Sequence, residues 1–125
     1  MGSQSPGIVV LAATVSPAEL ARLVSLYYGD MVKFVADVDL ERIALGGRMH
    51  AEAERLLLEA GSAPTSIWGA RYYPGRGRER CIEYTSQVNV RPSQGNPSIE
   101  IRDPEIRARV RKLTFALVGT GEKLP

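Results

Sequence analysis

A chain of 125 residues is long enough for one globular domain and too short for two of ordinary size. Hydrophobic residues make up 44% of it and charged residues 24%, and no apolar run approaches the roughly 20 residues of a membrane-spanning helix. The formal net charge of +2 is too small to indicate a nonspecific nucleic-acid binder. The single cysteine, Cys81, cannot form an internal disulfide, so we expect a cytoplasmic protein.

The first part of the chain predicts a tail, a strand and a helix. Residues 1–6 are expected to be a flexible tail, and the β-branched apolar run over residues 7–15 predicts a first strand. A helix follows, because Ser16 is a good N-cap, Pro17 suits the first helical position and Glu19 completes a capping box. Gly29 is placed to end this helix.

Residues 31–45 are the ambiguous part of the chain. Val32, Phe34, Ala36 and Val38 alternate with polar residues, which predicts a β-hairpin that resumes after "DLER". Helical spacing can also be traced through the same residues, so both interpretations stay open at this stage.

The segment "ALGGRMHAEAERLLLEAG", residues 44–61, predicts a helix that contains the only histidine, His50. Glu54 lies four residues after His50 and shares its side of the helix, whereas Glu52 is rotated away by about 200 degrees. With no second histidine and one distant cysteine, we expect neither a metal nor a cofactor.

This segment has two interpretations. In the first, His50 borders the apolar face of the helix and donates a hydrogen bond to Glu54. In the second, Gly46 and Gly47 bring the helix N-terminus close to an anionic small ligand, to which His50 adds a proton donor.

The second half of the chain predicts further strands and a last helix. "IWGARYYP" and a long strand from Arg80 to Arg91 flank the Gly-rich linker "GRGRE", with a bend expected near Ser86 or Gln87. "SIEIR" would pair with the long strand, placing mixed charges on one polar sheet face at Glu83, Thr85, Asn89, Arg91 and Glu100. Asp103 and Pro104 then begin a helix that ends at Gly119.

Short turns between strands indicate a mostly antiparallel sheet, so the fold class is α+β. We expect about five to seven strands and three helices, with the helices mainly on one face. The domain should span residues 7–119, followed by a flexible tail over residues 120–125.

Three blocks of this chain, "ALGGRMHAEAERLLLEAGS", "IWGARYYP" and "IEYTSQVNVRPSQGNPSIEIRDPEIR", resemble a family of small bacterial proteins described only as a domain of unknown function. The first block fits a Gly-Gly-x-x-His-Ala-x-x-Glu pattern, although Arg48 stands where the pattern favours an acid. The other two blocks carry a Trp-Gly pattern and an Ile-Glu-Tyr to Arg-Pro-x-x-Gly-Asn pattern. The matched residues are Gly46, Gly47, His50, Ala51, Glu54, Trp68, Gly69, Ile82, Glu83, Tyr84, Arg91, Pro92, Gly95 and Asn96. The likeness extends from about Tyr28 to the last helix and implies a single bacterial domain, with no implied reaction or cofactor.

The favoured functional interpretation is a homo-oligomeric domain, a dimer, that binds a partner or a small ligand. The alternative is an enzyme whose pocket gathers His50 with the polar sheet face, and the sequence does not decide between the two. The candidate ligand-binding residues are Gly46, Gly47, His50, Glu54, Trp68, Glu83, Asn89, Arg91 and Asn96.

A second alternative is nucleic-acid binding through the three arginines between Arg76 and Arg80. It is disfavoured because Glu79 and Glu83 lie among these charges and no row of aromatic residues accompanies them.

Overall fold

The computed structural model describes residues 7–125, so the tail predicted over residues 1–6 lies outside the described residues. Within residues 7–125 the chain forms a five-stranded antiparallel sheet in the order β1-β3-β2-β4-β5, together with three α-helices. The α+β class is therefore confirmed. The strands are β1 (Ile8–Leu11), β2 (Val32–Asp37), β3 (Arg42–Gly46), β4 (Ile67–Tyr72) and β5 (Ile82–Glu83). The helices are α1 (Pro17–Tyr27), α2 (His50–Glu59) and α3 (Pro104–Leu117). No helix in this part of the chain is both long and apolar enough to cross a membrane.

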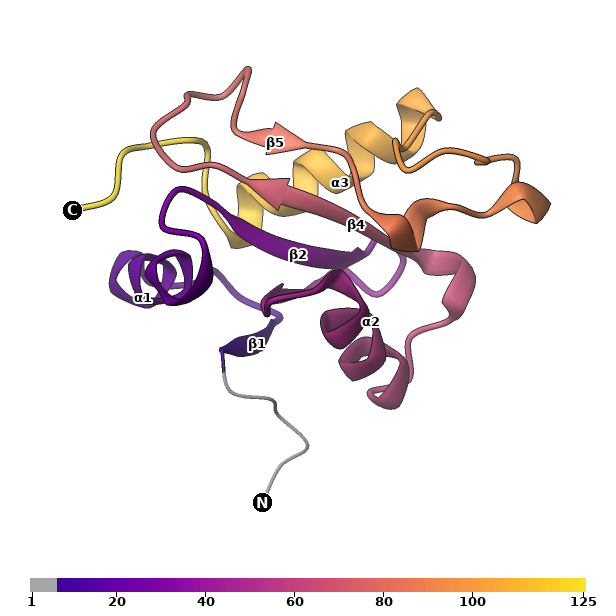
Figure 1. Cartoon of the computed structure of the whole chain (residues 1–125), viewed down its shortest axis with the longest axis horizontal. Coiled ribbons are helices and arrows are strands. Elements are labelled where there is room, and N and C mark those ends of the chain that lie inside the picture. Colours follow the sequence, from indigo (N-terminus) through magenta and orange to yellow (C-terminus); the bar gives the residue numbers. More distant parts are fainter. Residues whose placement is uncertain (1–6) are drawn as a thin grey trace.

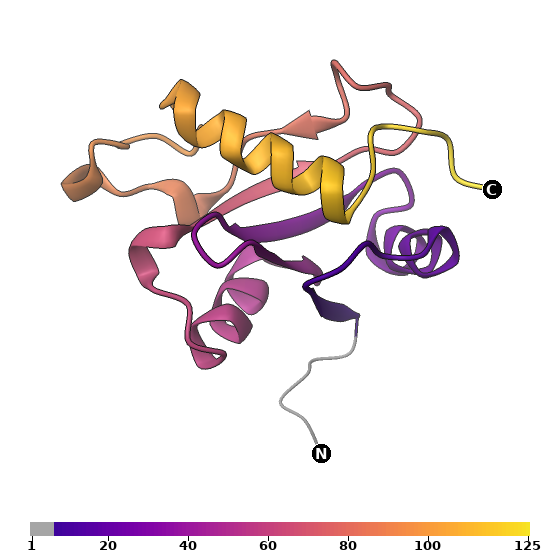
Figure 2. The same ribbon diagram turned by 180° about the vertical axis from the view of Figure 1, so that it is seen from behind.

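The helices cover both faces of the sheet, with two of the three on one face. Alternation along β2 sends Phe34 into a large core that also contains residues of α1 and α3, and sends Val35 into a smaller core under α2. Figure 1 shows α2 in front of the sheet, and the reverse view in Figure 2 shows α3 crossing the other face. The face under α2 carries the candidate site.

Residues 31–45 form a β-hairpin, which decides between the two interpretations of that segment. Four residue pairs join β2 to β3, from Phe34 opposite Leu45 to Asp37 opposite Arg42. The Asp37 side chain, which is fully buried, accepts hydrogen bonds from the backbone N–H groups of Asp39 and Leu40 and so closes the turn.

Helices α1 and α3 begin at the predicted capping residues. The Ser16 hydroxyl accepts a hydrogen bond from the backbone N–H of Glu19 (3.1 Å), and the Asp103 carboxylate accepts one from Glu105 (2.8 Å). Both helix starts are local features of the sequence and are confirmed.

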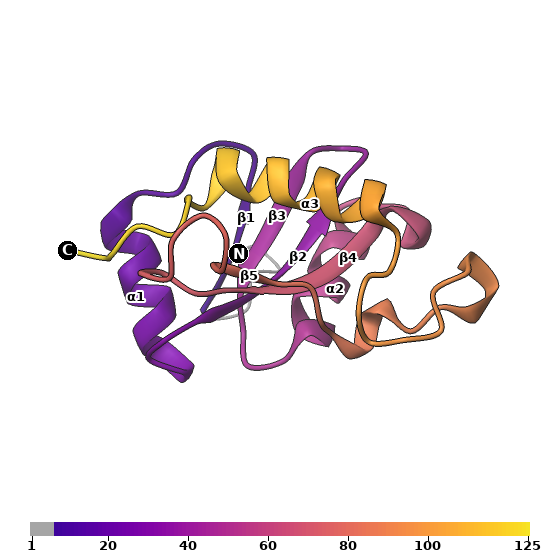
Figure 3. The same cartoon turned by 90° about the horizontal axis from the view of Figure 1, so that it is seen from above.

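The prediction of a long strand from Arg80 to Arg91 was wrong. Strand β5 spans only Ile82–Glu83, and residues 84–103 form a long loop that contains the 3-10 turns η2 (Gln87–Asn89) and η3 (Pro92–Gln94). Of the predicted pairing with "SIEIR", one isolated bridge between Thr85 and Glu100 is present. Figure 3 shows the long loop extending from one end of the molecule. The residues expected on a polar sheet face therefore lie in a loop instead.

Candidate functional site

The two glycines before α2 allow close packing against the first strand. Gly46 has a φ of 111°, and a Cβ atom there would lie 2.0 Å from the backbone oxygen of Gly7. Gly47 donates its backbone N–H to the same oxygen at 3.0 Å. The Gly-Gly pair therefore brings β3 against β1 before the chain turns into α2.

Helix α2 begins at His50. Because α2 starts there, the N–H groups of His50 and Ala51 have no partner inside the helix. The Glu52 carboxylate accepts from the preceding N–H groups of Arg48 (3.0 Å) and Met49 (3.1 Å). This carboxylate fixes the start of the helix and leaves the next two N–H groups for another partner.

His50 is buried, with 7% of its surface exposed, and its Nε2 lies 2.7 Å from the carbonyl oxygen of Ala70 on β4. A carbonyl oxygen only accepts, so Nε2 carries the proton and Nδ1 is the acceptor of the neutral ring. The pKa of His50 is lowered to about 4, chiefly because burial disfavours the imidazolium. The hydrogen bond to Ala70 opposes this shift, and the positive charges of Lys33 and Arg71 add to it. His50 is therefore neutral at pH 7.

A hollow of about 160 Å³ opens beside His50 at the start of α2. Side chains of α2, β2, β4 and η2 line it, and no acid is among the described residues that do so: Lys33, Met49, His50, Ala51, Arg71, Ser86, Gln87 and Val88. The charged side chains in this lining, Lys33 and Arg71, are therefore both cations.

Lys33 and Arg71 are directly opposite each other in the β2–β4 pairing. Like charges in this arrangement repel, which costs about 0.2–1 kcal/mol unless something between them compensates. Lys33 donates to the Arg48 carbonyl (3.1 Å), and Arg71 forms an ion pair with Glu83 (3.3 Å). The Nε of Arg71 is buried without a hydrogen-bond partner among the described residues.

The wall of the hollow opposite α2 depends on Gly69 and Asn89. A Cβ atom on Gly69 would lie 2.6 Å from the Ser86 Cβ and 2.8 Å from a Val88 methyl group, so only glycine lets η2 pack this closely on β4. The Asn89 side chain accepts from the Gly69 N–H (2.8 Å) and donates to the Gly69 carbonyl (2.9 Å). One amide thus replaces the neighbouring strand where β5 has ended.

Asn96 organises the far part of the long loop. Its side-chain amide donates to the carbonyl oxygens of Asn89 (2.9 Å), Ser98 (3.0 Å) and Glu100 (2.9 Å), and its oxygen accepts from Arg102 (2.9 Å). Both asparagines are buried, so each satisfies backbone groups that a loop would otherwise leave without partners.

Glu54, Trp68 and Arg91 form a cluster beside the hollow. The Arg91 guanidinium lies 3.9 Å from the Glu54 carboxylate and 4.7 Å from the centre of the Trp68 ring. Its Nε donates to the Val88 carbonyl at 3.1 Å. Burial lowers the pKa of Arg91, which the Glu54 charge opposes. This cluster joins α2, β4 and the long loop. Glu54 pairs with Arg91, whereas His50 forms its hydrogen bond with Ala70 and not with Glu54 as in the first interpretation of this segment.

Of the nine candidates predicted from the sequence, His50 lines the hollow. Gly46 and Gly47 precede α2, whose first residues line the hollow, and Glu83 forms an ion pair with the lining residue Arg71. The others, Glu54, Trp68, Asn89, Arg91 and Asn96, hold the surrounding elements together. Sequence patterns did not indicate Lys33, Ser86 or Gln87, because their approach to His50 depends on strand register and on the path of the long loop.

The described part of the chain contains no group of metal ligands, and two of its exposed arginines between Arg76 and Arg80 lie against aromatic rings. Within residues 7–125 no three His, Cys, Asp or Glu side chains are grouped as metal ligands. The Arg76 and Arg78 guanidinium groups lie over the rings of Tyr73 (3.7 Å) and Phe115 (4.7 Å). Aromatic residues do therefore accompany these arginines, but the guanidinium groups lie over the rings of Tyr73 and Phe115. Nucleic-acid binding through these arginines stays a disfavoured alternative that these contacts do not test.

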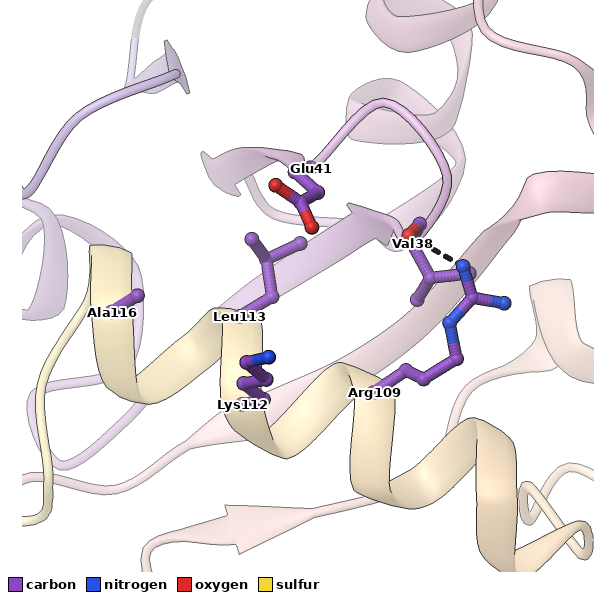
Figure 4. A pocket seen from close by; sticks show the side chains of 6 residues that line it. All are labelled: Val38, Glu41, Arg109, Lys112, Leu113 and Ala116. Carbon is purple, nitrogen blue, oxygen red and sulfur yellow. Dashed lines mark hydrogen bonds between the residues drawn. The ribbon is translucent and has the colours of Figure 1, made fainter.

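Another hollow, of about 200 Å³, lies between α3 and the β2–β3 turn (Figure 4). Glu41 and Lys112 contribute opposite charges to its lining. Arg109 donates to the Val38 carbonyl (2.8 Å) and forms an ion pair with Asp39 (2.8 Å), so its charge is already balanced. Beside His50, Arg71 is paired with Glu83, and Lys33 forms no ion pair with an acid among the described residues.

Comparison with known proteins identifies a family and no activity. Neither the curated proteins nor the solved structures contain a significant match to this chain. A family model described as "Protein of unknown function (DUF5674)" matches residues 9–117, from β1 to the end of α3, and so extends well before Tyr28. This chain belongs to the DUF5674 family of proteins of unknown function.

Proposed function

We propose that this protein binds a small anionic ligand in the hollow beside His50. The observation that carries the proposal is the pair of cations, Lys33 and Arg71, placed opposite each other on neighbouring strands and facing the start of α2. An anion between them would remove their repulsion and would accept from the N–H groups at the helix N-terminus. It would also give the buried Nε of Arg71 an acceptor.

The size of the hollow limits the ligand. A space of about 160 Å³ suits a phosphate or carboxylate group, with the rest of a larger ligand remaining outside. Ser86 and Gln87 supply neutral polar groups at the same place, which suits recognition of several oxygen atoms.

The state of His50 supports binding over catalysis. A general base works best when its pKa is near the working pH, and that of His50 is about 4. The carboxylates that would assist it in an enzyme, Glu54 and Glu83, are in ion pairs with Arg91 and Arg71. The one N–H of the neutral His50 ring is already donated to the Ala70 carbonyl, so His50 supports the wall of the hollow, and the anion would be held by Lys33, Arg71 and the N–H groups at the start of α2.

Inorganic phosphate is the simplest probe of this site. Added to isotope-labelled protein at low ionic strength, it should shift the backbone amide resonances of His50 and Ala51 in a saturable way. Replacing Lys33 or Arg71 by Met removes one charge-assisted hydrogen bond, so each change should weaken binding about tenfold or more. Nuclear magnetic resonance titration of each variant measures the loss.

Lys112→Met is the matched control, because it removes the same charge from exposed α3 on the other face of the sheet. It should leave phosphate binding within about twofold, as expected for a distant screened charge. Equal weakening by Lys33→Met and Lys112→Met, or shifts that do not include His50 and Ala51, would show that net charge alone attracts the phosphate.

We further propose a homodimer that acts in the cytoplasm. Strand β1 is an edge of the sheet, and apolar side chains are exposed on β1 at Val10 (37%) and on or next to α1 at Leu26 (44%) and Tyr28 (38%). An exposed strand edge with apolar neighbours supports pairing with a second copy. Sedimentation at micromolar concentration should give twice the mass of the chain, and a monomer mass would rule the dimer out.

A further inference from the structure

A further cavity, which shares no lining residue with the hollow beside His50, lies between the start of α1, the end of α3 and residues 119–125. Its volume is about 530 Å³, within the range of sites that hold drug-sized molecules. Apolar side chains contribute to its lining, among them Val15, Leu20, Phe115, Val118 and Leu124.

Residues 119–125 form one wall of this cavity through specific hydrogen bonds. The Gly121 carbonyl accepts from the N–H groups of Gly75 (3.1 Å) and Gly77 (3.0 Å), and the Gly121 N–H donates to the Tyr72 hydroxyl (2.8 Å). This segment, expected from the sequence as a tail, is thus tied to the β4–β5 loop. The wall is built from backbone contacts and leaves the interior of the cavity open.

Two polar side chains of the cavity, Tyr72 and Lys123, have hydrogen-bond donors that are not used by the described residues. Burial raises the pKa of Tyr72, so its hydroxyl keeps a proton, and no acceptor for that proton is found among the described residues. Lys123 likewise forms no ion pair with any acid in residues 7–125. In contrast, both Glu122 oxygens accept from Thr120, at 2.8 and 2.6 Å. A ligand that supplies an acceptor therefore fits this lining better than one that supplies a donor.

The charge around the cavity also favours an acid. Two guanidinium groups, those of Arg78 and Arg111, lie over the Phe115 ring at 4.7 and 4.8 Å from its centre. With Lys123 they place three cations near the cavity, whose lining also includes the Glu122 carboxylate.

We propose that this cavity binds a small organic acid with an apolar body, which lies between Leu20, Phe115 and Val118. Its carboxylate accepts from the Tyr72 hydroxyl and pairs with Lys123. This site is independent of the anion site beside His50, since the two share no lining residue.

Decanoate is a suitable probe, with decanol and decylamine as neutral and cationic counterparts. Titrated into the full chain, decanoate should bind at about millimolar concentration or better and should shift resonances of Leu20, Phe115 and Val118. Decanol and decylamine should each bind about tenfold more weakly. Lys123→Met should lower decanoate affinity about tenfold, and Tyr72→Phe should do the same if the fold tolerates the loss of the Gly121 contact.

Lys123 is exposed, so its replacement tests the proposal even if Tyr72→Phe fails to fold. Lys33→Met serves as the cross-control: it should weaken phosphate binding and leave decanoate binding unchanged, whereas Lys123→Met should do the reverse. Decanoate that fails to bind, that binds no better than decanol or decylamine, or that shifts resonances elsewhere would overturn the proposal. Phosphate binding beside His50 would be unaffected by any of these results.

Discussion

Replacing Asn89 by alanine is expected to lower the free energy of unfolding by about 3–5 kcal/mol, because three hydrogen bonds, two of them buried, are lost without replacement. The N–H and carbonyl of Gly69 are left without this partner, and the Ile99 carbonyl keeps only its hydrogen bond from the Ser86 N–H. Water cannot easily replace the amide, because Asn89 is fully buried. Urea denaturation should show a lower midpoint, and amide exchange in residues 84–103 should become faster.

Ser93→Ala is the control within the same loop, because Ser93 is exposed and lies in η3. It should change stability by no more than about 0.5 kcal/mol. If Asn89→Ala costs less than about 1 kcal/mol, the amide does not hold the long loop against β4, and the wall of the hollow must depend on other contacts.

Gly46→Ala should have a comparably large effect, about 2–4 kcal/mol, through strain and lost strand pairing. A methyl group on Gly46 would lie 2.0 Å from the Gly7 oxygen, and the φ of 111° is unfavourable for any side chain. The contact is with backbone, so relief requires β1 to move away from β3. Equilibrium unfolding measures the total cost, and amide exchange in β1 locates it.

Gly29→Ala separates the two causes. Gly29 has a φ of 84°, and a Cβ atom there would have no neighbour within 4 Å, so only the backbone strain applies. Its cost should be about 1–2 kcal/mol. Equal losses from Gly29→Ala and Gly46→Ala would contradict the view that Gly46 is required for close packing of β1.

Local signals in the sequence predicted the helices well and the first strand in part, since β1 spans Ile8–Leu11 of the predicted residues 7–15. Ser16 and Asp103 act within their own helix starts, so the information needed is contained in a few neighbouring residues. The α+β class followed from those elements and from the short turns between them. The choice of hairpin for residues 31–45 needed the structure, because alternation and helical spacing both fitted that segment.

The long strand was predicted wrongly because its alternating pattern has another cause. Val88 packs against Gly69, and the buried Asn89 side chain forms a hydrogen bond with Gly69 on β4. Apolar and polar residues therefore alternate here without strand pairing. The Asn89 amide can replace a strand only because it closely approaches Gly69, which is 20 residues away in the sequence. Periodicity within one segment cannot report such a contact.

The candidate site was predicted in part for the same reason. His50 attracted attention as the only histidine, and the Gly46 and Gly47 pair marked the start of its helix. Lys33 and Arg71 meet beside it because of the register between β2 and β4, which depends on the whole sheet. Most residues of the family pattern, including Asn96 and Arg91, maintain the scaffold around the hollow.

The most direct test of anion binding is the pKa of His50, measured from its ring resonances with and without phosphate. The chain has one histidine, so the titration needs no assignment. Without phosphate the pKa should be about 4, since burial and the charges of Lys33 and Arg71 disfavour the imidazolium. A bound anion offsets those charges and favours the protonated ring, so phosphate should raise the pKa, and Lys33→Met should reduce this rise. A pKa near the ordinary 6.5, or one that saturating phosphate leaves unchanged, would contradict the proposed site.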